Sequence, residues 1–250
     1  MAFGDGDSID PLAVDGRAEK SGLNQASSAK WGPTNAQIKS RERVRDLAEV
    51  YTHKREVDAM LDLVAPMFPS EGDPANTDRT FLEPACGSGN FLEEILRRKL
   101  AFVSVARYGR GDRYEHRILR CVASIYGIDI SQDNVDESRD RMRAVVNSHL
   151  DNDLNTKVVS DAFASAVEAI LGTNIILGDT VADADRINLV EYRASHGCTF
   201  IRTWTTLDAA SREMDLFAAM TPKCDARPVH FKELASHPEP VPALLNGVEA

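Results

Sequence analysis

Three acidic side chains stand where short apolar segments end, and they are the residues of this chain best suited to chemistry. Glu83 precedes a glycine-rich turn at Gly87-Ser88-Gly89, Asp129 ends the segment Ile125-Tyr126-Gly127-Ile128-Asp129, and Asp179 follows Asn174–Gly178. Glycines let a backbone approach a ligand closely, and the N–H groups at the start of the following helix are free to bind it. An acid just before the turn suits an ammonium or sulfonium group. The later acids suit ribose hydroxyls and an exocyclic amine.

Each acid taken alone also fits a solvated strand end or a cap on a local turn. Their occurrence in order, at the ends of successive apolar segments, favours one shared binding site over three unrelated ends. The turn at Gly87-Ser88-Gly89 lacks the third glycine of the dinucleotide fingerprint and the Gly-Lys-Ser/Thr of a phosphate-binding loop. The pattern therefore indicates a nucleotide-like cofactor that carries a positive charge.

The elements that must position these acids alternate along the chain. The residue patterns predict an α/β fold, namely a Rossmann-like, doubly wound and mostly parallel sheet with helices on both faces. Two β-like segments separated by only five residues predict an antiparallel hairpin instead. The expected strands are 79–83, 124–130, 174–177, 187–192 and 198–203, and the expected helices are 40–62, 90–105, 113–122, 134–149, 161–171 and 207–220.

Composition sets the expected domain organisation. The chain has 250 residues, of which 43% are hydrophobic and 27% charged, as is usual for a globular protein. We expect a flexible arm at 1–38, a cofactor-binding domain at 39–220 and a loose, proline-rich tail at 221–250. We expect neither a membrane span nor a signal peptide, because no apolar run is long enough. Four scattered cysteines indicate a cytoplasmic protein without disulfides, and neither they nor the six histidines have metal-ligand spacing.

The order of the motifs resembles the S-adenosylmethionine domain of adenine-N6 DNA methyltransferases of restriction–modification type. The resemblance is carried by Glu83-Pro84-Ala85-Cys86-Gly87-Ser88-Gly89-Asn90-Phe91, then Gly127-Ile128-Asp129, then Gly178-Asp179. Arg43–Thr52 is similar to the segment that precedes the cofactor loop in that family, although Thr52 is followed by His rather than by the usual Pro. The similarity covers roughly Lys39 to Thr180.

The resemblance implies S-adenosyl-L-methionine as the cofactor and assigns nine binding positions. The methionine part would lie along Glu83, Cys86, Gly87 and Gly89. Asp129 would bind the ribose, Ile130 would pack on the adenine, and Asp179 would accept a hydrogen bond from the adenine amine. Tyr51 and Thr52 would close the site.

The methyl-transfer half of the family pattern is missing from this sequence. The family carries an Asn/Asp-Pro-Pro-Tyr/Phe turn after the fourth strand, whose aromatic residue stacks on the flipped base. This chain has no proline between Pro84 and Pro222 and no adjacent prolines anywhere. Asp183, Asp185 and Asn188 are polar but lack that frame, so no residue is assigned as catalytic.

Two functions from different classes follow. The chain is expected to be an S-adenosylmethionine-dependent DNA methyltransferase, adenine-N6 specific, of a restriction–modification or phage-related system. The acceptor turn would then come from an unorthodox loop or from a second subunit, and a second subunit could also supply the target recognition. Alternatively, it is a non-catalytic or degenerate methyltransferase-like subunit that binds S-adenosylmethionine and acts through a partner. Methylation of a substrate other than DNA stays open as well.

DNA is the expected partner, although the net charge of −10 does not favour binding by bulk charge. Two basic clusters stand out, Lys39 to Arg45 and the stretch from Arg97 to Arg120. Such runs fit two solvated helix faces, and they also fit one basic surface offered to phosphates.

Overall fold

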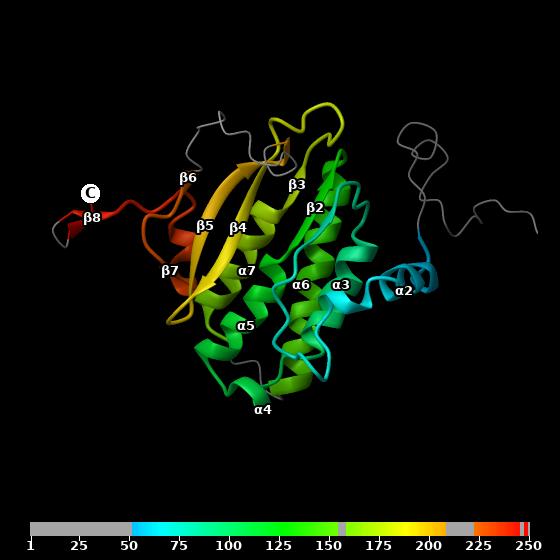
Figure 1. Cartoon of the computed structure of the whole chain (residues 1–250), viewed down its shortest axis with the longest axis horizontal. Coiled ribbons are helices and arrows are strands. Elements are labelled where there is room, and N and C mark those ends of the chain that lie inside the picture. The colour runs from blue at the N-terminus through cyan, green and yellow to red at the C-terminus, as the bar shows by residue number, and fades with distance from the viewer. Residues whose placement is uncertain (1–51, 155–158, 209–222, 246–247, 250) are drawn as a thin grey trace, which may run out of the picture. The chain divides into compact units, whose positions relative to one another are not determined.

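The computed structural model describes residues 52–154, 159–208, 223–245 and 248–249 (Figure 1). All of these belong to one of the two units into which the chain divides, Thr34–Ala250. Predictions for the arm at 1–38, for the basic cluster Lys39 to Arg45, for Tyr51 and for a helix at 209–220 lie outside the described residues. The elements in chain order are α2 Lys54–Asp62, η2 Ala65–Met67, β1 Phe81–Glu83, α3 Asn90–Leu100, α4 Val105–Tyr108, α5 Asp112–Ala123, β2 Ile125–Asp129, α6 Gln132–Leu154, α7 Asp161–Asn174, β3 Ile175–Leu177, β4 Asn188–Ser195, β5 Thr199–Thr206, β6 Lys223–Cys224, β7 Val229–His230, η3 Phe231–Ser236, β8 Leu244–Leu245 and β9 Val248–Glu249.

The predicted parallel sheet is confirmed for three strands, in the order β1-β2-β3. Phe81 lies opposite Ile125, and Gly127 lies opposite Ile175. Parallel neighbours need a crossover, and helices provide it here, α3 to α5 before β2 and α6 and α7 before β3. The carboxyl ends of the three strands therefore meet at one edge of the sheet.

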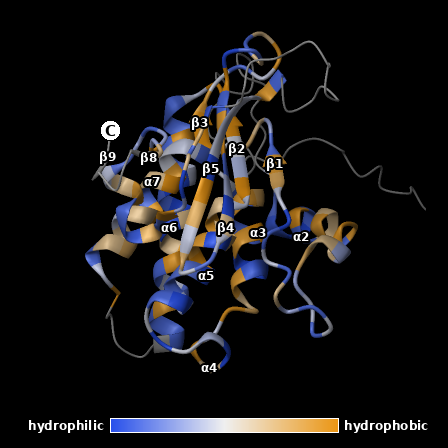
Figure 2. Cartoon of the chain, turned by 60° about the vertical axis from the view of Figure 1, so that its left-hand side comes forward, coloured by the Kyte–Doolittle hydropathy of each residue, from blue (hydrophilic) through white to orange (hydrophobic). Residues whose placement is uncertain are grey.

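The two faces of β2 are covered differently. On one face, a Cβ placed at Gly127 would meet Leu92 of α3 at 2.6 Å, so the strand lies directly against that helix. On the other face, Tyr126 and Ile128 cluster with Ile187 and Leu189 at the start of the β4 segment. The sequence predicts helices on both faces, whereas part of one face packs on this segment. The residues of β3 are hydrophobic (Figure 2), with Ile175 fully buried and Leu177, at the carboxyl end, 52% exposed.

The predicted antiparallel hairpin is confirmed, and it belongs to a separate sheet. β4 pairs with β5 from Asn188 opposite Thr206 to Ser195 opposite Thr199, and β6 and β7 also pair with β5. Gly197 and Cys198 have φ angles of 68° and 61°, which give the tight reversal. Figure 1 shows β4 and β5 in yellow beside α5 and α7. The described residues thus form a mixed α/β structure with a three-stranded parallel sheet, a four-stranded antiparallel sheet and the antiparallel pair of β8 and β9.

The segment 223–241, for which the sequence favours a loose tail, is packed. Phe231 and Val229 are fully buried, and Leu234 is 1% exposed. The five prolines after Asp179 suggested irregular chain, but apolar residues between them meet α5, α7 and β5 in the main core. A high proline content therefore does not prevent this segment from packing into the core.

Several helix boundaries also differ from the predictions. The helix expected at 90–105 ends at Leu100, and the short helix α4 lies between it and α5. α6 runs to Leu154, beyond the expected end at 149. In α2, Val57 and Leu61 are buried, whereas Met60 is 54% exposed, so the helix buries a narrow face. In the described part of the chain, no helix is long and apolar enough to cross a membrane.

His116 joins α5 to the antiparallel sheet and makes folding pH-dependent. Its ring lies 4.6 Å from that of Phe200, and its Nε2 is 3.2 Å from the carbonyl oxygen of Thr199. Burial, followed by the charge of Arg120, lowers the pKa of His116 from 6.5 to about 4. Between these values the unfolded chain binds the proton and the folded chain does not, so stability falls as the pH falls.

We expect the free energy of unfolding to drop on the order of 2 kcal/mol between pH 6.5 and 4 because of His116. Urea unfolding at a series of pH values measures this slope. His116→Phe should flatten it, because the aromatic contact with Phe200 is kept and the titrating group is removed. His196→Gln, a change at an exposed histidine, should leave it unchanged. An equal slope in wild type and His116→Phe would contradict the assignment.

Candidate binding site at the strand ends

The glycine turn after β1 is held in place by the neighbouring strand and by α6. The N–H of Cys86 donates to the carbonyl of Ile128, 2.9 Å away. Gly89 has a φ of 85°, and a Cβ there would lie 2.8 Å from the Ser138 hydroxyl oxygen, so only glycine fits. Gly87 has a φ of 53°, and a Cβ there would meet no described atom within 4 Å. The turn therefore packs tightly at Gly89 and offers an open backbone at Gly87.

Asp129 ties the end of β2 to this turn. Its Oδ2 accepts from the N–H of Gly87 at 2.8 Å, and its Oδ1 accepts from the N–H of Ser131 at 2.9 Å and from the Asn134 amide at 3.1 Å. The residue is 8% exposed. A carboxylate offers about four acceptor positions, so three donors leave room for about one more. Asp129 is mainly a structural acceptor with limited capacity for a ligand.

Asp179 lies at the same edge, after β3. The N–H of Gly178 donates to the carbonyl of Asp129 at 2.9 Å, and the Thr180 hydroxyl donates to the carbonyl of Pro84 at 3.3 Å. The Oδ1 of Asp179 accepts from the N–H groups of Val181 and Ala182, both at 2.9 Å. The hydrogen bond from Ala182, followed by that from Val181, lowers the pKa of Asp179. Its Oδ2 is the oxygen left to accept from a ligand.

Glu83 and Cys86 differ in what they can do. Burial raises the pKa of Glu83, and within the described part of the chain its carboxylate accepts a long hydrogen bond of 3.4 Å from the N–H of Ala85. Burial also raises the pKa of the Cys86 thiol to about 12, with a further contribution from Asp129. The thiol is therefore protonated at neutral pH and is not a nucleophile. Glu83 is the residue here that suits a cation.

Apolar side chains flank the acids. Ile130 directly follows Asp129 and is 54% exposed, and Leu177 precedes Gly178 and is 52% exposed. Asp129 and Leu177 are register partners, so the two aliphatic side chains come from neighbouring strand ends. Exposed aliphatic groups beside hydrogen-bonding groups are typical of a site that takes a flat ring.

Thr52 is linked to the glycine turn by a hydrogen bond from Asn90, a residue to which the sequence assigned no binding role. The side-chain amide of Asn90, the first residue of α3, donates to the carbonyl of Thr52 at 3.0 Å. Three further residues were missed, namely Ser138, Arg141 and Leu177. Ser138 and Arg141 lie three residues apart on α6, and that spacing places them on one helix face. This spacing is the sequence signal that could have identified Ser138 and Arg141.

The structure thus brings most of the predicted positions to one edge. Gly87 and Asp129 are in direct contact, the Asp179 loop bonds to the turn through Thr180 and Pro84, and Thr52 bonds through Asn90.

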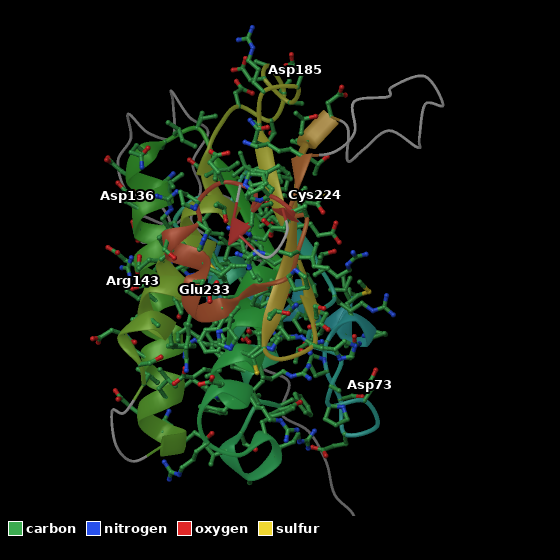
Figure 3. The ribbon with its side chains drawn as sticks, turned by 90° about the vertical axis from the view of Figure 1, so that its left-hand side faces the viewer. Asp73, Asp136, Arg143, Asp185, Cys224 and Glu233 are labelled. Atoms are coloured by element: carbon green, nitrogen blue, oxygen red, sulfur yellow. The ribbon has the colours of Figure 1, made fainter. Side chains whose placement is uncertain are left out.

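The polar residues considered for the transfer step make local contacts. Asp183 pairs with Arg186 at 3.3 Å, and the Asn188 amide donates to the carbonyl of Arg186 at 3.1 Å. Asp185 lies on the loop between β3 and β4 (Figure 3). This loop leads into the antiparallel hairpin, so the chain leaves the parallel sheet directly after Asp179.

The stretch from Arg97 to Arg120 is not one uniform basic surface, because several of its basic side chains already have partners within the fold. Lys99 is fully buried, donates to the carbonyls of Thr77 and Arg79, and has its pKa lowered to about 8 by burial. Arg120 pairs with Asp78. Other members also have acidic or carbonyl partners, namely Arg97, Arg98 and Arg117.

Arg97 is exposed but pairs with Glu93. The other exposed arginines of this stretch are Arg107, Arg110 and Arg113. They lie on and around α4, which Figure 1 shows at the opposite end from the carboxyl ends of β2 and β3. A phosphate backbone held there would contact a region remote from the glycine turn.

Comparison of the chain with protein-family models, with curated proteins and with solved structures finds no match. Among the described residues, no group of three or more His, Cys, Asp or Glu side chains is arranged to hold a metal ion.

Proposed function

We propose that this chain binds S-adenosyl-L-methionine at the carboxyl ends of β1, β2 and β3, and that it is related to adenine-N6 DNA methyltransferases with a Rossmann-like, doubly wound fold. The observation that carries the proposal is the contact between Gly87 and Asp129, at 2.8 Å, beneath an open backbone position. A ligand lying on that position would lie at the edge where all three acidic strand ends stand. The free thiols of all four cysteines suit the reducing cytoplasm.

Each proposed site residue would contact a different part of the cofactor. Glu83, whose pKa is raised by burial, would face the ammonium or sulfonium charge, which favours its ionised form. Asp129 would accept from a ribose hydroxyl with its remaining capacity. Ile130 would pack on the adenine, and Asp179 would accept from the adenine amine through Oδ2.

The bound cofactor would supply an activated methyl group. In the proposed reaction a carbon–nitrogen bond forms at N6 of adenine, the carbon–sulfur bond breaks, and N6 loses one proton. The adenine must leave the duplex stack to reach such a site. A second subunit is proposed to supply the acceptor turn and the target recognition.

A non-catalytic, cofactor-binding subunit is the second candidate, and one observation favours it. After β3 the chain enters the antiparallel hairpin of β4 and β5, with no Pro-Pro-aromatic sequence at that point. Such a subunit would bind S-adenosylmethionine and act through a partner.

Calorimetry and a transfer assay separate these possibilities. We expect S-adenosylmethionine to bind the purified chain, and we expect labelled methyl groups to enter adenine-containing DNA but not DNA whose adenines already carry N6-methyl groups. Binding without transfer to any DNA would favour the non-catalytic subunit. Absence of binding would contradict both candidates.

Exposed Arg107, Arg110 and Arg113 provide the matching test for DNA. Their replacement by alanine should weaken DNA binding and flatten its salt dependence if they contact phosphates. If the salt dependence of DNA binding is unchanged, these arginines are a solvated face and do not contact phosphates.

A further inference from the structure

Asn90 stands at a junction of three elements. It is the first residue of α3, directly after Gly89, and its side chain reaches both α6 and Thr52, two residues before α2. Its Oδ1 accepts from Nη1 of Arg141 at 2.7 Å, and its Nδ2 donates to the carbonyl of Thr52 at 3.0 Å. The glycine turn, α6 and the chain entering α2 therefore share one side chain.

Arg141 fixes which way the Asn90 amide points. A guanidinium only donates, so the atom that it contacts must be the amide oxygen. The NH₂ group then faces the carbonyl of Thr52, which only accepts. Arg141 is itself held by Glu93 at 2.8 Å and by the carbonyl of Ser88 at 2.9 Å. Only a side chain with both an acceptor and a donor meets these two demands.

The connection to α2 is short. Thr52 directly precedes His53, whose carbonyl accepts from the N–H groups of Glu56 and Val57 at the start of α2. Val57 is 1% exposed in the core, and Lys54 pairs with Glu94 of α3 at 3.1 Å. Asn90, Lys54 and Arg141 also line a pocket of about 250 Å³ between α2, α3 and α6. A displacement of the glycine turn would therefore shift the residues at the start of α2.

We propose that Asn90 is a positioning residue that ties the chain entering α2 to the glycine turn, so that occupancy of the turn orders residues 52–57. This deepens the proposed function and rests on it for the identity of the ligand. The bond to Thr52 is a neutral hydrogen bond, so its loss is expected to weaken ligand binding about three- to tenfold.

Asn90→Asp is the sharpest test. The carboxylate still accepts from Arg141, but it cannot donate to Thr52. The matched control is Asn188→Asp, which makes the same chemical change at an exposed amide whose partner is the nearby Arg186 carbonyl. Asn90→Ala removes both bonds of Asn90 and reports the cost of losing the Arg141 contact as well.

Hydrogen exchange without ligand tests the positioning itself. In Asn90→Asp, the amides of Glu56 and Val57 should exchange faster than in wild type, while those of β2 stay unchanged. Asn188→Asp should behave as wild type at both places. Unchanged exchange at Glu56 and Val57 would overturn the proposal, whatever the chain binds.

S-adenosylhomocysteine tests the link to occupancy. In wild type it should slow exchange at Glu56 and Val57. In Asn90→Asp it should bind about three- to tenfold more weakly and slow that exchange less. Full protection in the variant would overturn the coupling. If wild type binds no S-adenosylhomocysteine, the proposed function and the occupancy link both fail, and the exchange measured without ligand still decides whether Asn90 positions the start of α2.

Discussion

Replacement of Asp129 by alanine is expected to lower the free energy of unfolding by about 2–4 kcal/mol and to abolish detectable binding of S-adenosylmethionine. The side chain is nearly buried and accepts three hydrogen bonds, from Gly87, Ser131 and Asn134. Its removal deprives buried donors of their acceptor, and each such loss costs about 1–3 kcal/mol without full additivity. Urea unfolding measures the first effect, and calorimetry measures the second.

Asp179→Ala is the control for this prediction. Asp179 ends a neighbouring strand but caps its own turn at the surface, through Val181 and Ala182. Its loss should cost no more than about 1 kcal/mol while still weakening ligand binding. If Asp129→Ala unfolds at the same urea concentration as wild type, Asp129 does not hold the glycine turn.

Arg202→Met is expected to lower the free energy of unfolding by about 3–5 kcal/mol. Arg202 in β5 and Asp225 form an ion pair whose side chains are 2% and 0% exposed. Arg202 also donates to the carbonyls of His237 and Glu239, and Asp225 accepts from the N–H of Val241. Removing the cation leaves a buried carboxylate without its charge partner and loosens segment 223–241 from β5.

Two comparisons make this result specific. The double variant Arg202→Met with Asp225→Leu should recover part of the loss, because no unpaired charge is then buried. Disruption of the exposed pair between Arg186 and Asp183, by Arg186→Met, should cost less than about 1 kcal/mol. A single-variant loss as small as that of the exposed pair would show that the buried pair adds little.

Local patterns carried the sequence predictions that the structure confirms. Apolar segments that end at Glu83, Asp129 and just before Asp179 indicated strands, and the intervening 3.6-residue periods indicated helices. A five-residue gap was too short for a parallel crossover, so the β4–β5 hairpin followed from length alone. These inferences need only neighbouring residues, because backbone preference and the burial of one face both leave a short-range signal.

The sequence could not indicate which distant groups each side chain would contact. Pro222 and Pro228 suggested a loose tail, yet Val229 and Phe231 are buried against helices more than 50 residues earlier in the chain. The run of arginines from Arg97 to Arg120 fitted either solvated helix faces or one basic surface, and it gave no sign that Arg120 pairs with Asp78. Charge and proline content describe a residue type, and only packing decides what faces it.

The candidate site at the carboxyl ends of β1, β2 and β3 was likewise only partly predictable from the sequence. By itself, the sequence determined that a glycine turn and three acids stand at strand ends, because the turn needs residues at positive φ and the strands need apolar runs. The tertiary structure alone decided that Asp129 bonds to Gly87, 42 residues away, and that Asn90 bonds to Thr52. The physical reason is that strand order and helix packing bring these groups within hydrogen-bonding distance, and neither can be read from one local segment.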